Sequence, residues 1–178
     1  MDSRQTTIWA FALALTFTAG WQDWRTCRIP NWLTVSGVFA GVTLHSWIAG
    51  WRGAITAFEG AGLALIILLP LVLMRALGAG DWKLMGGVGA ILGPGMFLFV
   101  LLASIFVSGL MAIVVVVQTK RVKTTLRNLA VLVRGFLSFG LRAHPEISLD
   151  NPTLVKLPFG VAAMIGTLIC FLAARWGM

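Results

Sequence analysis

Charged side chains are scarce in this chain of 178 residues. Only 11% of the residues are charged and 58% are hydrophobic, whereas a soluble domain has about 25% charged and about 45–50% apolar residues. A soluble fold of this length could not bury so much apolar surface, and a disordered chain would be far less hydrophobic. The composition therefore predicts an integral membrane protein.

Cysteine is also rare, and several catalytic motifs are missing. The two cysteines, Cys27 and Cys170, form no Cys-x-x-Cys pair, which excludes a zinc ribbon and a disulfide scaffold. The chain has no Gly-x-Ser-x-Gly motif. His45 is expected toward the outer end of its helix, which argues against a serine intramembrane protease built on Ser36 or Ser108. No metal or other cofactor is expected.

Basic residues outnumber acidic ones by 14 to 6, which gives a net charge of +8. In a soluble chain this excess would suggest nucleic acid, but the sequence contains no nucleic-acid-binding motif. Membrane proteins collect Lys and Arg in their cytoplasmic loops. The charge therefore indicates an orientation in the membrane, and no nucleic-acid partner is expected.

The apolar residues form six runs, which predict an all-α, polytopic membrane helix bundle in a single domain, residues 1–178. A span needs roughly 20 apolar residues, and Gly93-Pro94-Gly95 divides one run that is too long. The fourth run is short, because 12 residues of helix cover only ~18 Å. The predicted spans are residues 6–22, 32–51, 54–75, 82–93, 95–117 and 157–174.

The basic residues predict an N-terminus outside the cytoplasmic (inner) membrane. With this orientation only Arg4, Arg52 and Arg175 lie outside. The other 11 of the 14 basic residues lie on the cytoplasmic side, as the positive-inside rule requires. They are Arg25, Arg28, Arg75, Lys83, Lys120, Arg121, Lys123, Arg127, Arg134, Arg142 and Lys156.

Residues 118–155 form the one long loop, on the cytoplasmic side. Its first half has a helical apolar stripe beside a basic face. A basic amphipathic helix next to a span typically lies on the anionic cytoplasmic leaflet, and a docking surface for a partner is the alternative. The stripe comprises Leu126, Leu129, Val133, Phe136 and Leu137.

Two aspartates, Asp23 and Asp81, lie at the ends of predicted spans. Exactly two spans separate them, so the chain returns to the same face and both carboxylates are predicted at the cytoplasmic edge. Two close carboxylates can share a proton, so that one accepts a proton from water while the other donates one to a carbonyl oxygen. This chemistry hydrolyses a peptide bond without a covalent intermediate. Helix capping or pairing with a basic residue is the alternative for each aspartate, and Glu59 is interpreted as structural.

Three motifs accompany these aspartates. Asp23 precedes Ile29-Pro30-Asn31, Asp81 ends Gly78-x-Gly80-Asp81-x-Lys83, and the last span begins with Pro158-Phe159-Gly160. Glycines before a carboxylate let another backbone approach closely, and Pro30 marks a turn. In this order, the motifs resemble those of the type IV prepilin peptidases, the GxGD class of membrane aspartyl proteases.

The resemblance implies an enzyme that cuts the basic leader from prepilins or pseudopilins of type IV pilus and secretion systems, at the cytoplasmic face. Asp23 and Asp81 would be the catalytic pair. The resemblance does not tell which of them acts as the acid and which as the base. Lys83 would be a supporting residue, although an ordinary interfacial lysine is an equally good interpretation. The other supporting residues would be Gly78, Gly80, Pro30, Asn31, Pro158, Phe159 and Gly160.

The chain departs from the larger, bifunctional members of that family. Those carry an additional N-terminal cytoplasmic region, often with Cys-x-x-Cys motifs, that is linked to N-methylation. Here the first span starts by about residue 6, so no methyl transfer is expected. The compact form resembles the Flp/Tad-type peptidases, and archaeal preflagellin peptidases are similar in size.

A small transporter, or a non-enzymatic subunit of a pilus or secretion machine, is the alternative function. It would place acidic residues near the middle of the membrane, whereas both aspartates are predicted at one edge. The expected partners are prepilin leader peptides and the lipid bilayer. The sequence does not specify an oligomeric state.

Overall fold

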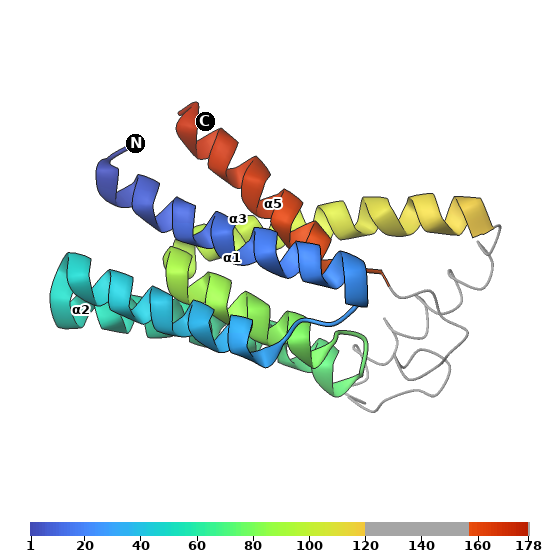
Figure 1. Ribbon diagram of the computed structural model, residues 1–178, viewed down its shortest axis with the longest axis horizontal. Helices are drawn as coiled ribbons and strands as arrows, with labels where there is room; N and C mark the ends of the chain where they lie inside the picture. Colours follow the sequence, from blue (N-terminus) through green and yellow to red (C-terminus); the bar gives the residue numbers. More distant parts are fainter. Residues whose placement is uncertain (120–156, 178) are drawn as a thin grey trace.

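The computed structural model describes residues 1–119 and 157–177, and all regular secondary structure in these ranges is helical. The two chain termini lie toward one end of the bundle, and the C-terminal end of α1 lies at the other (Figure 1). The all-α prediction is therefore confirmed. The helices are α1 (Ser3–Thr26), α2 (Asn31–Leu73), α3 (Ala79–Thr119) and α5 (Phe159–Arg175).

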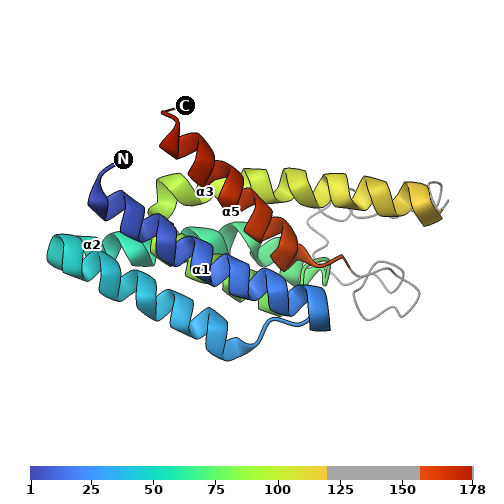
Figure 2. The ribbon, with the colours of Figure 1, turned by 45° about the horizontal axis from the view of Figure 1, so that its top comes forward.

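The two long helices, α2 and α3, each turn back on themselves (Figures 1 and 2). The turn in α2 lies at Ala49 and Gly50, and Gly50 has φ 59° and ψ −140°. The turn in α3 lies at Gly93, with φ 73° and ψ 171°. Both glycines have a positive φ, which glycine adopts without strain because it has no Cβ. Pro94 follows the second turn and has no N–H group to continue the helical hydrogen bonds.

The prediction of six separate transmembrane helices is not supported. The described residues form four helices, and two of these, α2 and α3, are long and apolar enough to cross a membrane. The sequence predicts breaks after residues 51 and 93, and the chain does reverse close to both positions, at Gly50 and Gly93, but by sharp turns within α2 and α3 and without separate loops. The predicted spans 32–51 and 54–75 therefore both belong to α2, and the predicted spans 82–93 and 95–117 both belong to α3. The predicted amphipathic helix lies outside the described residues.

The first half of α3 is the buried centre of the bundle. Every residue from Leu84 to Gly93 is buried. Small residues allow this close packing, because Gly60 of α2 lies against the backbone of Gly89, and Gly41 lies against the backbone of Ala90. The short predicted fourth span, residues 82–93, is thus largely surrounded by protein, and its length need not match the hydrocarbon core.

Large apolar side chains are exposed on the outside of every helix. Examples are Phe17 on α1, Phe39 on α2, Phe106 on α3 and Leu168 on α5. Soluble monomers rarely expose so much apolar surface, whereas lipid solvates it. This surface and the two long apolar helices support the prediction that the chain is a membrane protein.

The packing of α2 on α3 predicts opposite effects for two glycines of the same helix. A Cβ at Gly60 would collide with the carbonyl oxygen of Gly89, whereas a Cβ at Gly62 would meet nothing within 4 Å. Overpacking a tight contact costs about 1–3 kcal/mol. We expect Gly60→Ala to lower the thermal unfolding midpoint in detergent, and Gly62→Ala to leave it unchanged or raise it slightly. Equal midpoints for both variants would contradict this packing.

Candidate active site

Three helix ends meet at the end of the bundle farthest from the two chain termini (Figure 1). Asp23 lies near the C-terminal end of α1, Asp81 lies in the first turn of α3, and Gly160 lies in the first turn of α5. Helix α1 ends at Cys27, whose backbone is left-handed (φ 48°) and whose N–H donates to the Asp23 carbonyl (2.8 Å). Pro30 then begins α2 as its N-cap residue. The α1–α2 connection is therefore short and begins one helical turn after Asp23.

The carboxylate of Asp23 is held by the start of α5. The side chain is 5% exposed, and its Oδ2 accepts a hydrogen bond from the backbone N–H of Gly160 (2.7 Å). A Cβ on residue 160 would lie 3.0 Å from both Cβ and Oδ2 of Asp23, so glycine is what allows this approach. The N-terminus of a helix favours a nearby negative charge, so the start of α5 offsets the unfavourable C-terminal end of α1.

Asp81 lies close enough to Asp23 for the two charges to interact. Its carboxylate also lies against the backbone of Gly78, where a Cβ would be 2.9 Å from Asp81 Oδ2, and the Gly78 N–H favours the negative charge of Asp81. Because Asp81 is in the first turn of α3, the helix dipole again favours its negative charge. The structure thus brings together the two aspartates of the sequence analysis, and one uncharged backbone donor holds each of them.

The glycine-containing turn before Asp81 packs against the α1–α2 connection. A Cβ at Gly80 would lie 3.3 Å from the Cβ of Ile29. One turn into α3, Lys83 Nζ donates a hydrogen bond to Asn31 Oδ1 (3.1 Å). Lys83 and Asn31 are both exposed, so this bond contributes little to stability. Its geometric consequence is that the start of α2 is tied to the turn that carries Asp81.

Pro158 and Phe159 support the site from a distance. Pro158 is the N-cap residue of α5, with φ −73° and ψ 94°. Its carbonyl accepts a hydrogen bond from the N–H of Val161 (3.2 Å). Phe159 packs against the hydrophobic core. Both residues fix where α5 begins, and with it the position of the Gly160 N–H.

Trp82 is a supporting residue that the sequence analysis did not identify. It lies next to Asp81, is half-buried, and its Nε1 donates to the backbone carbonyl of Leu65 in α2 (2.8 Å). A buried indole usually needs such a partner for its N–H group. Trp82 therefore fastens the start of α3 to the second half of α2, and the adjacency of an aromatic residue to Asp81 was the only signal in the sequence.

Other polar residues considered in the sequence lie elsewhere. His45 Nε2 donates to the backbone carbonyl of Ile91 (2.9 Å), next to the turn of α3. Glu59 is exposed on the second half of α2. Lys156, just before α5, lies outside the described residues. Asp23 and Asp81 are therefore the acidic residues that the structure places together at this end of the bundle.

In a comparison with family models, the chain matches the type IV leader peptidase family over residues 10–113. This range contains both aspartates and the segments Ile29-Pro30-Asn31 and Gly78-x-Gly80-Asp81-x-Lys83. Neither a curated protein nor a solved structure gives a match. The match covers more than half of the chain and therefore shows that the chain belongs to this family.

The packing of Gly80 on Ile29 predicts that cysteines at these two positions form a disulfide. The Cβ–Cβ distance of 3.3 Å is close to the ~3.5–4.5 Å of disulfides. We expect Ile29→Cys with Gly80→Cys, in a Cys27→Ser, Cys170→Ser background, to oxidise in membranes, as measured by mass spectrometry after alkylation of free thiols. The matched control is Ile29→Cys with Gly62→Cys, which should stay reduced. Equal oxidation of the two pairs would show that the motifs do not converge.

Proposed function

Because the chain belongs to the type IV leader peptidase family, we propose that it is a membrane aspartyl endopeptidase. Family membership supports a peptidase, and thus a hydrolase. The proposed substrates are Flp/Tad-like type IV prepilins or pseudopilins, from which the enzyme removes the basic leader. The observation that carries the proposal is the proximity of Asp23 and Asp81, each with a backbone N–H on its carboxylate.

The proposed mechanism uses the two carboxyl groups as a general base and a general acid. The ionised carboxylate removes a proton from a water molecule, whose oxygen attacks the scissile carbonyl carbon. The protonated carboxyl group donates its proton to the carbonyl oxygen. Collapse of the tetrahedral intermediate breaks the C–N bond, and the leaving amine takes up a proton. Water is the nucleophile, so neither a covalent intermediate nor a cofactor takes part, and N-methylation is not included in the proposed activity.

The proposed location is the inner membrane, with the aspartates at the cytoplasmic face and the N-terminus outside. Among the described residues, Arg25, Arg28, Arg75 and Lys83 lie in the segments that adjoin the aspartates. Arg4 and Arg175 lie near the chain termini, and Arg52 follows the turn of α2. Cytoplasmic ends of membrane proteins carry the excess of basic residues, and this supports the proposed orientation.

The mechanism predicts that Asp23→Asn and Asp81→Asn each abolish cleavage of a co-expressed Flp-type prepilin. General acid or base catalysis contributes about 10²- to 10⁴-fold, so the processed pilin band should disappear on a gel. The matched control is Glu59→Gln, which removes an exposed carboxylate of the same protein and should cleave like wild type. If both asparagine variants are inserted at wild-type levels and still cleave, the two-aspartate mechanism is wrong.

The hydrogen bond from Gly160 predicts a second effect on activity. In Gly160→Ala the new Cβ would press on Asp23 at 3.0 Å and displace the carboxylate from its donor. A misplacement of about 1 Å can lower a rate by about 100-fold, and we expect a reduction of about 10- to 100-fold in kcat, with a smaller change in KM. Gly109→Ala, where a Cβ meets nothing within 4 Å, should retain wild-type kinetics. A wild-type kcat for Gly160→Ala would show that Gly160 does not position the Asp23 carboxylate.

A further inference from the structure

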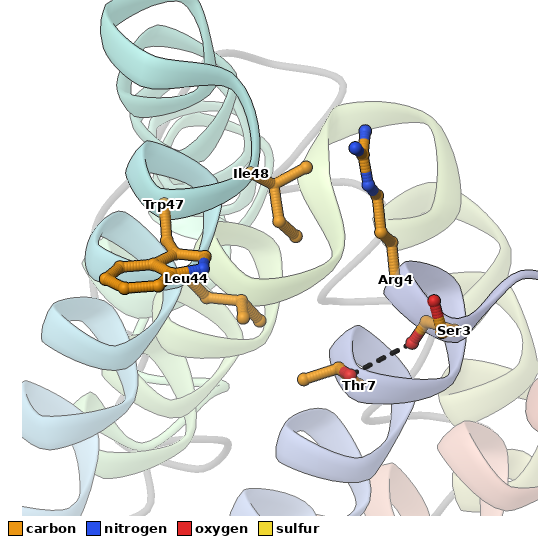
Figure 3. Close-up of a pocket in the computed structure, with 6 residues that line it drawn as sticks. All are labelled: Ser3, Arg4, Thr7, Leu44, Trp47 and Ile48. Carbon is orange, nitrogen blue, oxygen red and sulfur yellow. Dashed lines mark hydrogen bonds between the residues drawn. The ribbon is translucent and has the colours of Figure 1, made fainter.

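A pocket lies between the N-terminal turns of α1 and the last turn of α2 before its turn at Gly50. Its volume is about 300 Å³, and six residues line it (Figure 3). The polar lining comes from α1 and the apolar lining comes from α2, so the two walls differ in chemistry. We call it the Arg4 pocket, and it is formed by Ser3, Arg4, Thr7, Leu44, Trp47 and Ile48.

The α1 wall of the Arg4 pocket is basic and polar. In the described part of the chain, the guanidinium of Arg4 has neither a hydrogen bond nor an ion pair. The hydroxyl of Thr7 donates to the carbonyl of Ser3 (2.9 Å; Figure 3), and both residues line the pocket. None of the six lining residues is acidic. No lining residue therefore neutralises the positive charge of Arg4, and an anionic ligand bound at this wall would do so.

The α2 wall suits a hydrocarbon chain. The side chains of Leu44 and Ile48 extend from α2 toward α1 (Figure 3). Trp47 lies at the edge and is 90% exposed, as is common for tryptophan where the bilayer meets water. A small soluble anion would leave these apolar side chains unused, so the ligand should carry both an anionic group and an apolar part.

The position of the pocket along α1 matches the opposite surface of the bilayer. Arg4 and Asp23 belong to one uninterrupted helix, and the 19 residues from one to the other cover ~28 Å at 1.5 Å per residue. The hydrocarbon core of a bilayer is about 30 Å thick. If the aspartates lie at one interface, as proposed above, the Arg4 pocket lies at the other, among lipid headgroups.

We propose that the Arg4 pocket binds an anionic phospholipid. The phosphate would accept hydrogen bonds from Arg4, and the upper part of an acyl chain would pack on Leu44 and Ile48. A zwitterionic lipid is disfavoured, because its own ammonium group competes with Arg4 for the phosphate. This site is separate from the aspartate pair, and the proposal rests on the proposed function only for its placement in the membrane.

The test is lipid binding by the purified full-length protein, measured by native mass spectrometry with phosphatidylglycerol and phosphatidylcholine of identical acyl chains. A charge-assisted contact predicts a preference for phosphatidylglycerol of about tenfold. Arg4→Gln should remove this preference. Arg52→Gln, the matched control, removes a basic residue just after the turn of α2 that does not line the pocket, and should keep the preference.

Three results would overturn the proposal. They are the absence of a preference in wild type, an unchanged preference in Arg4→Gln, and an equal loss in both variants, which would indicate nonspecific charge. Inorganic phosphate is titrated as a competitor, and displacement of the lipid at equal concentration would be a fourth result that overturns the proposal, because it would identify a free anion as the ligand. Prepilin cleavage by the same preparations is recorded in parallel. Its failure would contradict the proposed function without affecting the lipid result.

Discussion

The repulsion between Asp23 and Asp81 is the constraint on which the rest of the site depends. Two carboxylates among apolar helices lose solvation and repel each other, so neither would stay in place without compensation. The compensation here consists of backbone N–H groups, from Gly160 for Asp23 and from Gly78 for Asp81. These donors carry no charge. An ion pair would hold a carboxylate permanently ionised, whereas an amide donor leaves it able to gain and lose a proton, as the proposed mechanism requires.

The positions of these donors follow from the packing of the whole bundle. The Gly160 N–H reaches Asp23 because α5 begins directly after Pro158 and lies closely against α1. The Gly78 turn reaches the same place because the first half of α3 is enclosed by α2, through contacts such as Gly60 with Gly89. Trp82 and Lys83 then tie the start of α3 to α2. Helix packing contacts beyond the two carboxylates thus determine the distance between them.

The aspartate pair could be predicted from the sequence, whereas the way it is held could not. Counting spans was enough to predict that Asp23 and Asp81 lie at the same end of the bundle, because that argument needs only the order of apolar runs. The donor to Asp23 comes from a backbone 137 residues away, and a backbone N–H leaves no side-chain pattern in a sequence. Hydropathy also could not separate a loop from a glycine that reverses a helix, so the turns at Gly50 and Gly93 were expected as interhelical loops. The supporting role of Trp82 could not be predicted either, because its partner is the main-chain carbonyl of Leu65, which leaves no pattern in a sequence.

The most direct test of the convergence of α1 and α3 is a measurement of whether positions 23 and 81 can be bridged. Cysteines would replace both aspartates in a Cys27→Ser, Cys170→Ser background, and the protein in native membranes would be treated with the shortest bifunctional thiol reagent. The account predicts an internal cross-link at high yield, detected by mass spectrometry, and a much lower yield when Asp2→Cys at the other end of α1 replaces Asp23→Cys. Equal yields for the two pairs, or no cross-link between positions 23 and 81, would contradict the account.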